Sequence, residues 1–140
     1  MSATHTEGLG GRMAMKAALD LAGLLPQEMD YINLHGTATP SNDAAEGKAV
    51  AGLFGATTAC SSTKGATGHT LGAAGALEAV ICVLALQNDL LPAGLNTQQV
   101  DPAIAINYLL KNGQKSISRV MSNSFGFGGT NCSLIFGRAN

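Results

Sequence analysis

Apolar residues recur at helical spacing through residues 10–25, which predicts an amphipathic helix. Its polar positions recur every four residues and are Arg12, Lys16 and Asp20. The helix is expected to end near Gly23 and Pro26, two residues that commonly stop helices. Residues 69–87 are apolar almost throughout, and we expect them to form a long buried helix.

Three residues interrupt the apolar pattern of residues 69–87. Gly72 and Gly75 each cost about 1 kcal/mol relative to alanine in a helix, so we expect a neighbouring backbone to pack closely there. Glu78 must find hydrogen-bond donors, a cation or a proton, because an unpaired buried carboxylate costs several kcal/mol. A structural carboxylate and part of an ion site are both open interpretations of Glu78.

Two short segments in the first half of the chain have strand character. Residues 30–34 are β-prone, and residues 56–62 are small and threonine-rich. Between them, residues 40–54 are predicted to be helical, with Ser41 and Asn42 as competing candidates for the N-cap position. A glycine directly after this segment is expected to end the helix.

The C-terminal part of the chain favours strands. Residues 103–108 alternate weakly, whereas residues 119–124 and 131–136 are clearer strand candidates. The sequence F-G-F-G-G-T between the last two has the length and composition of a tight hairpin. Alternating strands and helices followed by an antiparallel ending predict an α/β layered domain with a mixed sheet.

Composition narrows the class of protein. The 140 residues have the length of one domain, and 46% hydrophobic with 12% charged residues can fill a core. A net charge of −1 argues against a nucleic-acid partner. The low charge also indicates that part of the apolar surface is covered by a partner subunit or a missing half.

The cysteines and the N-terminus indicate a compartment. Cys60, Cys82 and Cys132 lie in or beside apolar runs, and an odd number of them favours buried free thiols over disulfides. The first residues show no secretory signal. Because Glu78 interrupts the longest apolar run, we do not expect that run to span a membrane. A soluble cytoplasmic domain is therefore expected.

Two polar loops follow the ends of two predicted strands. The loop H-G-T-A-T begins at His35, and the loop K-G-A-T-G-H covers residues 64–69. If the strands are parallel neighbours, both loops lie at the edge of the sheet where α/β proteins place their sites. Two imidazoles and an ammonium group would then converge, a set that can stabilise negative charge on a carbonyl oxygen without a metal. His5 has no such context, and we interpret it as structural.

The glycine-rich residues 126–129 invite comparison with phosphate-binding loops. They lack the spacing G-x-G-x-x-G, and Lys64 precedes its glycines instead of following them as in a Walker A loop. Nucleotide binding is therefore not expected. Such a turn can offer backbone N–H groups to an oxyanion or can simply close a hairpin.

Three stretches carry a resemblance to a known family. They read Y-I-N-L-H-G-T-A-T-P-S-N-D over residues 31–43, S-S-T-K-G-A-T-G-H-T-L-G-A-A-G over residues 61–75 and M-S-N-S-F-G-F-G-G-T-N over residues 121–131. Over essentially its whole length, the chain resembles the C-terminal half of a β-ketoacyl-acyl-carrier-protein synthase, a condensing enzyme of the thiolase superfamily. The resemblance implies a thiolase-like half with a layered, mixed five-stranded sheet and a buried helix between layers.

The resemblance also implies a reaction and its catalytic residues. The family performs a decarboxylative Claisen condensation, in which the carbanion released from malonyl-carrier protein attacks an acyl group held on a cysteine. By this resemblance, His35 and His69 hold the malonyl thioester carbonyl and stabilise the enolate. Lys64 matches the lysine that organises this network, and Glu46 matches the acid that pairs with that lysine.

Further family residues concern binding. The threonines that bind the phosphopantetheine arm match Thr37 and Thr39, and the gating phenylalanine, whose backbone N–H completes the oxyanion hole, matches Phe127. No cofactor of its own is implied, because the phosphopantetheine arrives on the carrier protein. Some members hold a monovalent or other cation under the site, in a cage that matches Asn33, Glu78, Ser122 and Asn131, and with this rationale we favour a cation or hydrogen-bond cage around the buried glutamate.

The family's nucleophilic cysteine lies in an N-terminal half that this chain does not contain. T-A-C-S-S over residues 58–62 resembles the sequence around that nucleophile, but Cys60 leads directly into Lys64 with no helix after it, so we do not interpret it as the nucleophile. We expect residues 1–140 to be a C-terminal ketoacyl-synthase domain that is inactive alone. Its expected partners are an acyl carrier protein, the missing N-terminal half and, in the full-length protein, a second copy.

Three other interpretations concern parts of the same sequence. A non-catalytic half-synthase module that docks with a partner chain or carrier protein would not need both histidines and the lysine. A polyketide or aryl-polyene pathway is an open alternative to fatty-acid elongation. A thiolase proper uses a second cysteine near the C-terminus, but Cys132 lies in a predicted strand just past the turn.

Overall fold

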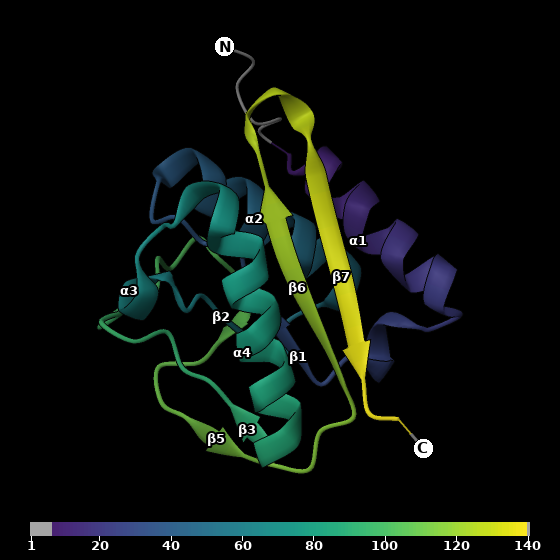
Figure 1. Cartoon of the computed structure of the whole chain (residues 1–140). Helices are drawn as coiled ribbons and strands as arrows, with labels where there is room; N and C mark the ends of the chain where they lie inside the picture. The colour runs from purple at the N-terminus through teal and green to yellow at the C-terminus, as the bar shows by residue number, and fades with distance from the viewer. Residues whose placement is uncertain (1–6, 140) are drawn as a thin grey trace.

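Five strands form one mixed sheet in the order β4-β2-β1-β6-β7, with helices on both of its faces (Figure 1). The computed structural model describes residues 7–139. The strands of this sheet are β1 (Tyr31–Asn33), β2 (Ala59–Ser61), β4 (Asn107–Tyr108), β6 (Arg119–Phe125) and β7 (Asn131–Gly137). The helices are α1 (Leu9–Ala22), α2 (Pro40–Phe54), α3 (Lys64–Thr67) and α4 (Ala74–Asn88), with 3₁₀ turns at Pro26–Glu28, Leu71–Ala73 and Phe127–Gly129.

The pairing of the strands confirms the predicted mixed sheet. β1 pairs in parallel with β2 and with β6, and β2 pairs in parallel with β4. Only β7 runs antiparallel, against β6, and the two form the predicted hairpin. Gly128 and Gly129 in its turn have φ angles of 81° and 83°, which glycine adopts readily. A second sheet of β3 (Leu90–Leu91) and β5 (Gly113–Gln114) was not predicted, because each strand has only two residues.

The alternation of side chains along β1 divides the core into two layers. Ile32 packs with residues of α1 and α2, whereas Tyr31 packs with Cys82 and Leu86 of α4. Successive residues of a strand point to opposite faces, so one short strand serves both layers. In Figure 1, α4 lies in front of the sheet and α1 behind it. The carboxyl ends of β1 and β2 therefore lie between two helical layers.

The helices of the first half follow the predicted pattern with one correction. α1 ends at Gly23, which has the left-handed conformation expected of a C-cap glycine. The prediction that Ser41 or Asn42 caps α2 was wrong, because the N-cap position is Thr39 and Pro40 is the first helical residue. Proline favours that position, since its missing N–H has no helical partner there.

The helix predicted over residues 69–87 begins later than expected. Gly68 and Leu71 have φ angles of 73° and 52°, so the chain cannot be helical through them, and α4 starts only at Ala74. A Cβ added to Gly75 would lie 3.2 Å from Ser124 Oγ, but one added to Gly72 would contact nothing. Close packing is thus found at the second glycine only, and against a side chain rather than the neighbouring backbone that was predicted.

The helix that was predicted to be buried, α4, is buried on one face and exposed on the other. Val80 and Leu84 are 55% and 50% exposed, and Leu134 of the neighbouring strand is 46% exposed. By length and composition, Leu71–Asn88 could cross a membrane. Its other face packs against β6 and carries a paired glutamate, which is the arrangement of a core helix, so this segment does not indicate a membrane span.

Candidate active site

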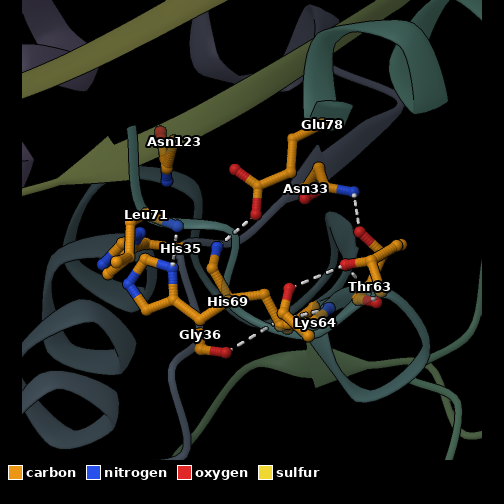
Figure 2. A network of polar contacts seen from close by, with 12 residues as sticks. Asn33, His35, Gly36, Thr63, Lys64, His69, Leu71, Glu78 and Asn123 are labelled. Carbon is orange, nitrogen blue, oxygen red and sulfur yellow. Dashed lines mark hydrogen bonds and ion pairs between the residues drawn. The ribbon is translucent and has the colours of Figure 1, made fainter. Parts of the chain in front are cut away.

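The two polar loops predicted from the sequence do converge. β1 and β2 are parallel neighbours in which Asn33 lies beside Ser61, so the segments after them leave the same edge of the sheet. Figure 2 shows the side chains of His35, Lys64 and His69 gathered at this edge. His5 lies outside the described residues.

The two imidazole rings are in contact. The ring centroids of His35 and His69 lie 5.6 Å apart with an interplanar angle of 86°. The Nδ1 atom of His69 accepts the N–H of Leu71 at 3.3 Å, so a neutral His69 carries its proton on Nε2. His69 is exposed, whereas His35 is buried.

His35 is held in its neutral form. Burial lowers the pKa of its imidazole to about 4, with smaller contributions from the charges of Lys64 and His69. At neutral pH, the ring is therefore a hydrogen-bond donor and acceptor and not a cation. Its Nδ1 atom is buried and has no hydrogen-bond partner. Phe125 packs beside it, with ring centroids 6.0 Å apart.

Lys64 pairs with Glu78 and not with Glu46, which corrects the expected pairing. The Lys64 ammonium forms a buried ion pair with Glu78 Oε1 (Figure 2). Glu46 instead accepts the backbone N–H groups of His35 at 2.9 Å and Gly36 at 2.8 Å. Sequence spacing could not reveal this, because both acids come from helices beside the same loop.

Both buried carboxyl groups have raised pKa values. Burial raises the pKa of Glu46, and the N–H groups of Gly36 and His35 oppose that rise. Burial also raises the pKa of Glu78, and the hydrogen bond and charge of Lys64 oppose it. In each case, the groups that oppose the rise favour the carboxylate form.

The turn after β1 is fixed from two sides. Gly36 has a φ angle of +40°, and a Cβ added to it would lie 2.4 Å from Ser62 Cβ. The Ser62 hydroxyl donates to the Gly36 carbonyl at 2.8 Å. Glycine is therefore required here both for its backbone conformation and for space. This turn sets the position of His35.

The four residues expected to form a cation cage do not lie on one side of the sheet. Ser122 lies beside Asn33 in the sheet register, and its side chain shares a hydrogen bond with the thiol of Cys82 in α4. These residues therefore face the helix that carries Glu78. Asn131 lies on the opposite face, where a Cβ on Gly10 of α1 would meet its Nδ2 at 2.4 Å. The cage prediction was wrong for Asn131.

The remaining three cage residues include unpaired oxygen atoms. Asn33 Oδ1 and Glu78 Oε2 are buried without a hydrogen-bond partner. The Asn33 amide donates to Thr63 Oγ1 at 3.2 Å (Figure 2). Among residues 7–139, no group of three or more His, Cys, Asp or Glu side chains converges to hold a metal ion.

A cavity of about 570 Å³ opens beside the histidines. Its lining includes polar side chains of Thr37, Lys64 and His69 as well as apolar ones of Leu95 and Ile104. Thr39 is exposed and exchanges a hydrogen bond with Thr37 at 3.0 Å, without being part of the lining. The side chain of Phe127 lies outside the described part of the structure.

The cysteines within the described residues do not form a nucleophilic site. Cys60 and Cys82 are 0% exposed, and burial raises the pKa of each thiol to about 12. The Cys60 thiol donates to the Asn107 carbonyl. Cys132 is free and exposed in β7. A low pKa and access are what reactive cysteines require, so Cys60 does not meet these conditions.

Sequence reasoning missed several supporting residues. Asn123 donates to Glu46 at 3.3 Å, and Ser62 donates to the carbonyl of Gly36 in the turn after β1. Thr63 accepts a hydrogen bond from Asn33, and Phe125 packs beside His35. These residues lie within the stretches that carry the family resemblance. The alternation of β6 could have identified Asn123 as an inward-facing polar residue, since its neighbour Met121 also points inward.

The chain is similar to known proteins over nearly its whole length. Residues 1–98 match the family model described as β-ketoacyl synthase, C-terminal domain. The mitochondrial 3-oxoacyl-[acyl-carrier-protein] synthase of Arabidopsis thaliana is 47% identical over 137 residues, which are 93% of this chain and 30% of the relative. The chain spans about a third of the length of the curated relatives it matches.

Solved structures have the same fold. A ketosynthase in complex with its chain length factor from Xenorhabdus doucetiae has a TM-score of 0.94 and 50% identity, covering 99% of this chain and 36% of that one. A type II polyketide ketosynthase in complex with its acyl-carrier protein and bound to a hexaketide has a TM-score of 0.93 and 26% identity, covering 100% of this chain and 35% of that one.

Proposed function

The chain belongs to the β-ketoacyl synthase family, in which it matches the C-terminal domain, and from this premise we propose that it supplies the decarboxylation half of a condensing site. The observation that carries the proposal is the contact between His35 and His69, whose rings lie 5.6 Å apart, together with the neutral state of His35. Two adjacent imidazoles can each donate one N–H group to the same oxygen atom.

In the proposed reaction, the thioester carbonyl oxygen of a malonyl group lies between the two imidazoles. The bond to the malonyl carboxylate breaks, CO₂ leaves, and the electron pair forms an enolate whose oxygen carries the charge. The two N–H donors stabilise that charge more strongly than they stabilise the neutral carbonyl, so they lower the barrier. The enolate carbon then attacks an acyl thioester on a cysteine of the N-terminal half, and that thiolate leaves.

Lys64 supports this role through charge. Its ammonium lowers the pKa of His35 and is itself held by Glu78 in a buried ion pair. Glu46 fixes the backbone of His35 and does not pair with the lysine. We propose that Lys64 and Glu46 act on His35 in different ways. The charge of Lys64 lowers the pKa of the His35 imidazole, and the carboxylate of Glu46 holds the His35 backbone by a hydrogen bond.

The unpaired oxygens of Asn33 and Glu78 are consistent with a cation site. With the hydroxyl of Ser122, they offer the oxygen donors that hard cations prefer. A bound monovalent cation would supply positive charge that offsets the second carboxylate oxygen of Glu78.

The cavity beside the histidines is the proposed entry for the thioester. Thr37 lines it, and a hydroxyl at that position can hydrogen-bond the amides of a phosphopantetheine arm. The proposed partner is an acyl carrier protein, since a related ketosynthase of known structure is in complex with one. Thr39 could contribute only near the rim, because it is exposed.

The exposed face of α4 is the proposed contact for the N-terminal half. Val80, Leu84 and Leu134 form exposed apolar surface on the side of the sheet opposite α1. Covering it would place α4 between two layers and remove apolar area from water. We propose that the full-length protein pairs with a second copy or with a related subunit, as the Xenorhabdus ketosynthase does with its chain length factor.

Reconstitution tests this function. The chain would be combined with the N-terminal half of a related ketosynthase that carries the nucleophilic cysteine, and release of CO₂ from malonyl-carrier protein would be measured with formation of 3-oxoacyl product. We expect product only in the mixture, and loss of both products with His35→Ala or His69→Ala. Condensation by the 140-residue chain alone would contradict the proposal.

A second candidate function is a non-catalytic module that docks with a partner chain or carrier protein. It is favoured by one observation, the burial and raised pKa of Cys60, the cysteine whose surrounding sequence resembles that of the family's nucleophile. Native mass spectrometry distinguishes the two. A partner with a reactive cysteine supports the enzyme, and a partner without one supports the module.

Pathway and location are also proposals. Fatty-acid elongation and polyketide or aryl-polyene synthesis both fit the relatives named above. We propose a cytoplasmic location for this protein. The relative from Arabidopsis thaliana is named as a mitochondrial enzyme.

A further inference from the structure

A chain of buried hydrogen bonds connects the hairpin of β6 and β7 to the turn that carries His35. Glu46 accepts the N–H groups of His35 and Gly36 at 2.9 and 2.8 Å. Asn123 Nδ2 donates to the same carboxylate at 3.3 Å, and the Ser133 hydroxyl donates to Asn123 Oδ1 at 2.8 Å. Asn123 is 0% exposed and Glu46 is 4% exposed, so water does not replace these contacts.

The two partners of Asn123 select one orientation of its amide. Ser133 lies opposite Asn123 in the antiparallel register, and its hydroxyl donates to the amide oxygen. The amide nitrogen must then point toward Glu46 and Met15. The reversed amide would place its oxygen against the Glu46 carboxylate, so that one acceptor faces another and Glu46 loses one of its donors.

A purely structural role does not account for these residues. An apolar side chain at position 123 could fill the space beside Met15, but Glu46 would then lose one donor and the Ser133 hydroxyl would lose its acceptor. The polar pair is explained if Glu46 must stay ionised, because burial disfavours its charge and each donor favours it. A protonated Glu46 would have one oxygen fewer to accept the two backbone N–H groups.

We propose that Asn123 and Ser133 are positioning residues of the site, which hold Glu46 as an oriented carboxylate so that Glu46 can fix the backbone of His35. The role of His35 rests on the proposed function. The positioning itself concerns hydrogen bonds that can be measured without turnover.

The test is amide hydrogen exchange, followed by NMR in the 140-residue chain. Ser133→Ala removes the donor to Asn123, and Asn123→Asp replaces the donor to Glu46 by a second carboxylate of the same shape. Cys132→Ser, on the same strand and facing the other way, is the matched control. We expect exchange at His35 and Gly36 to become about tenfold faster than in wild type with Ser133→Ala. Exchange at Ile32 in β1, the strand that leads into the turn of His35, should change much less.

The pH dependence separates positioning from packing. In Asn123→Asp, protection of the two amides relative to wild type should be low at pH 7.5 and return as the pH falls, because a protonated aspartic acid can donate to Glu46 again. A lost packing contact would not return with pH.

Two outcomes overturn the proposal. The first is that His35 and Gly36 exchange no faster in Ser133→Ala than in the Cys132→Ser control. The second is that exchange in Ser133→Ala rises equally at all residues of β1 and β2. If Asn123→Asp does not fold at pH 7.5, Ser133→Ala decides alone. Faster local exchange in a chain that forms no 3-oxoacyl product even when combined with the N-terminal half of a related ketosynthase would support the positioning and overturn only the proposed function.

Discussion

The ammonium group of Lys64 is ion-paired with the carboxylate of Glu78, and the two side chains are only 6% and 2% exposed. Lys64 begins α3 in the loop after β2, and Glu78 lies in α4. The pair therefore joins a loop of the candidate site to the helix that packs on the sheet. It also places a positive charge close enough to lower the pKa of His35.

Lys64→Met should destabilise the protein strongly. Removing the lysine leaves the carboxylate of Glu78 buried without its cation, which typically costs about 3–5 kcal/mol in the free energy of unfolding. Urea denaturation followed by circular dichroism measures this. Lys64→Met combined with Glu78→Met should recover most of the loss, because no buried charge remains.

The control is the exposed pair of Lys16 and Asp20, whose side chains are 63% and 62% exposed. Lys16→Met should change the free energy of unfolding by about 0.5 kcal/mol or less. Equal effects of Lys64→Met and Lys16→Met would mean that the buried pair is not formed in solution.

Much of this arrangement could be predicted from the sequence. Residues 31–43 and 61–75 gave both site loops, because strand ends and polar residues coincide there. The pattern of residues 119–136 gave the hairpin and thus the mixed sheet. These are local signals, in which the residues that determine an element are also the residues that form it.

The errors concern contacts between elements. Lys64 lies 18 residues from Glu46 and 14 from Glu78 in sequence, and only the packing of α4 selects Glu78. Asn131 was placed in a cage on the wrong face of the sheet, since strand register determines the face and a motif does not reveal it. The start of α4 was missed because Leu71 adopts a positive φ angle that its residue type does not favour.

His35→Gln should reduce the loss of stability in acid. Unfolded histidine binds a proton near pH 6.5, whereas folded His35 does so only near pH 4, so between these values the unfolded state binds more protons. His35 thus contributes stability that is present above pH 6.5 and is lost as the pH falls toward 4.

The measurement is urea denaturation of both proteins at pH 7 and pH 4.5. Between these values, the free energy of unfolding of wild type should fall by about 2–3 kcal/mol more than that of His35→Gln. Comparing the two proteins removes the contributions of Glu46 and Glu78, which titrate in both. An identical fall in the two proteins would show that folded His35 has an ordinary pKa.

Gly36→Ala should distort the turn that carries His35. The added Cβ would lie 2.4 Å from Ser62 Cβ, in addition to the strain of a positive φ angle. Gly68→Ala is the matched control, because Gly68 has a φ angle of +73° and a Cβ there would contact nothing.

We expect Gly68→Ala to cost about 1–2 kcal/mol through backbone strain alone and Gly36→Ala to cost at least about 1 kcal/mol more. Thermal or urea denaturation gives the free energies, and the NMR signals of His35 report the local distortion. Equal costs for the two variants would contradict the close approach of Ser62.

Alkylation by iodoacetamide should distinguish the three cysteines. Cys132 is exposed, whereas Cys60 and Cys82 are 0% exposed and have pKa values raised by burial to about 12. At pH 7.5, the thiolate fraction of each buried cysteine is on the order of 10⁻⁴ or less, and the thiolate is the reactive form. Mass spectrometry of digested protein should therefore find label at Cys132 alone in the folded chain.

All three cysteines should be labelled in urea, which controls for detection. Rapid labelling of Cys60 in the folded chain would contradict its burial and would make T-A-C-S-S a candidate nucleophile motif, against the interpretation given above.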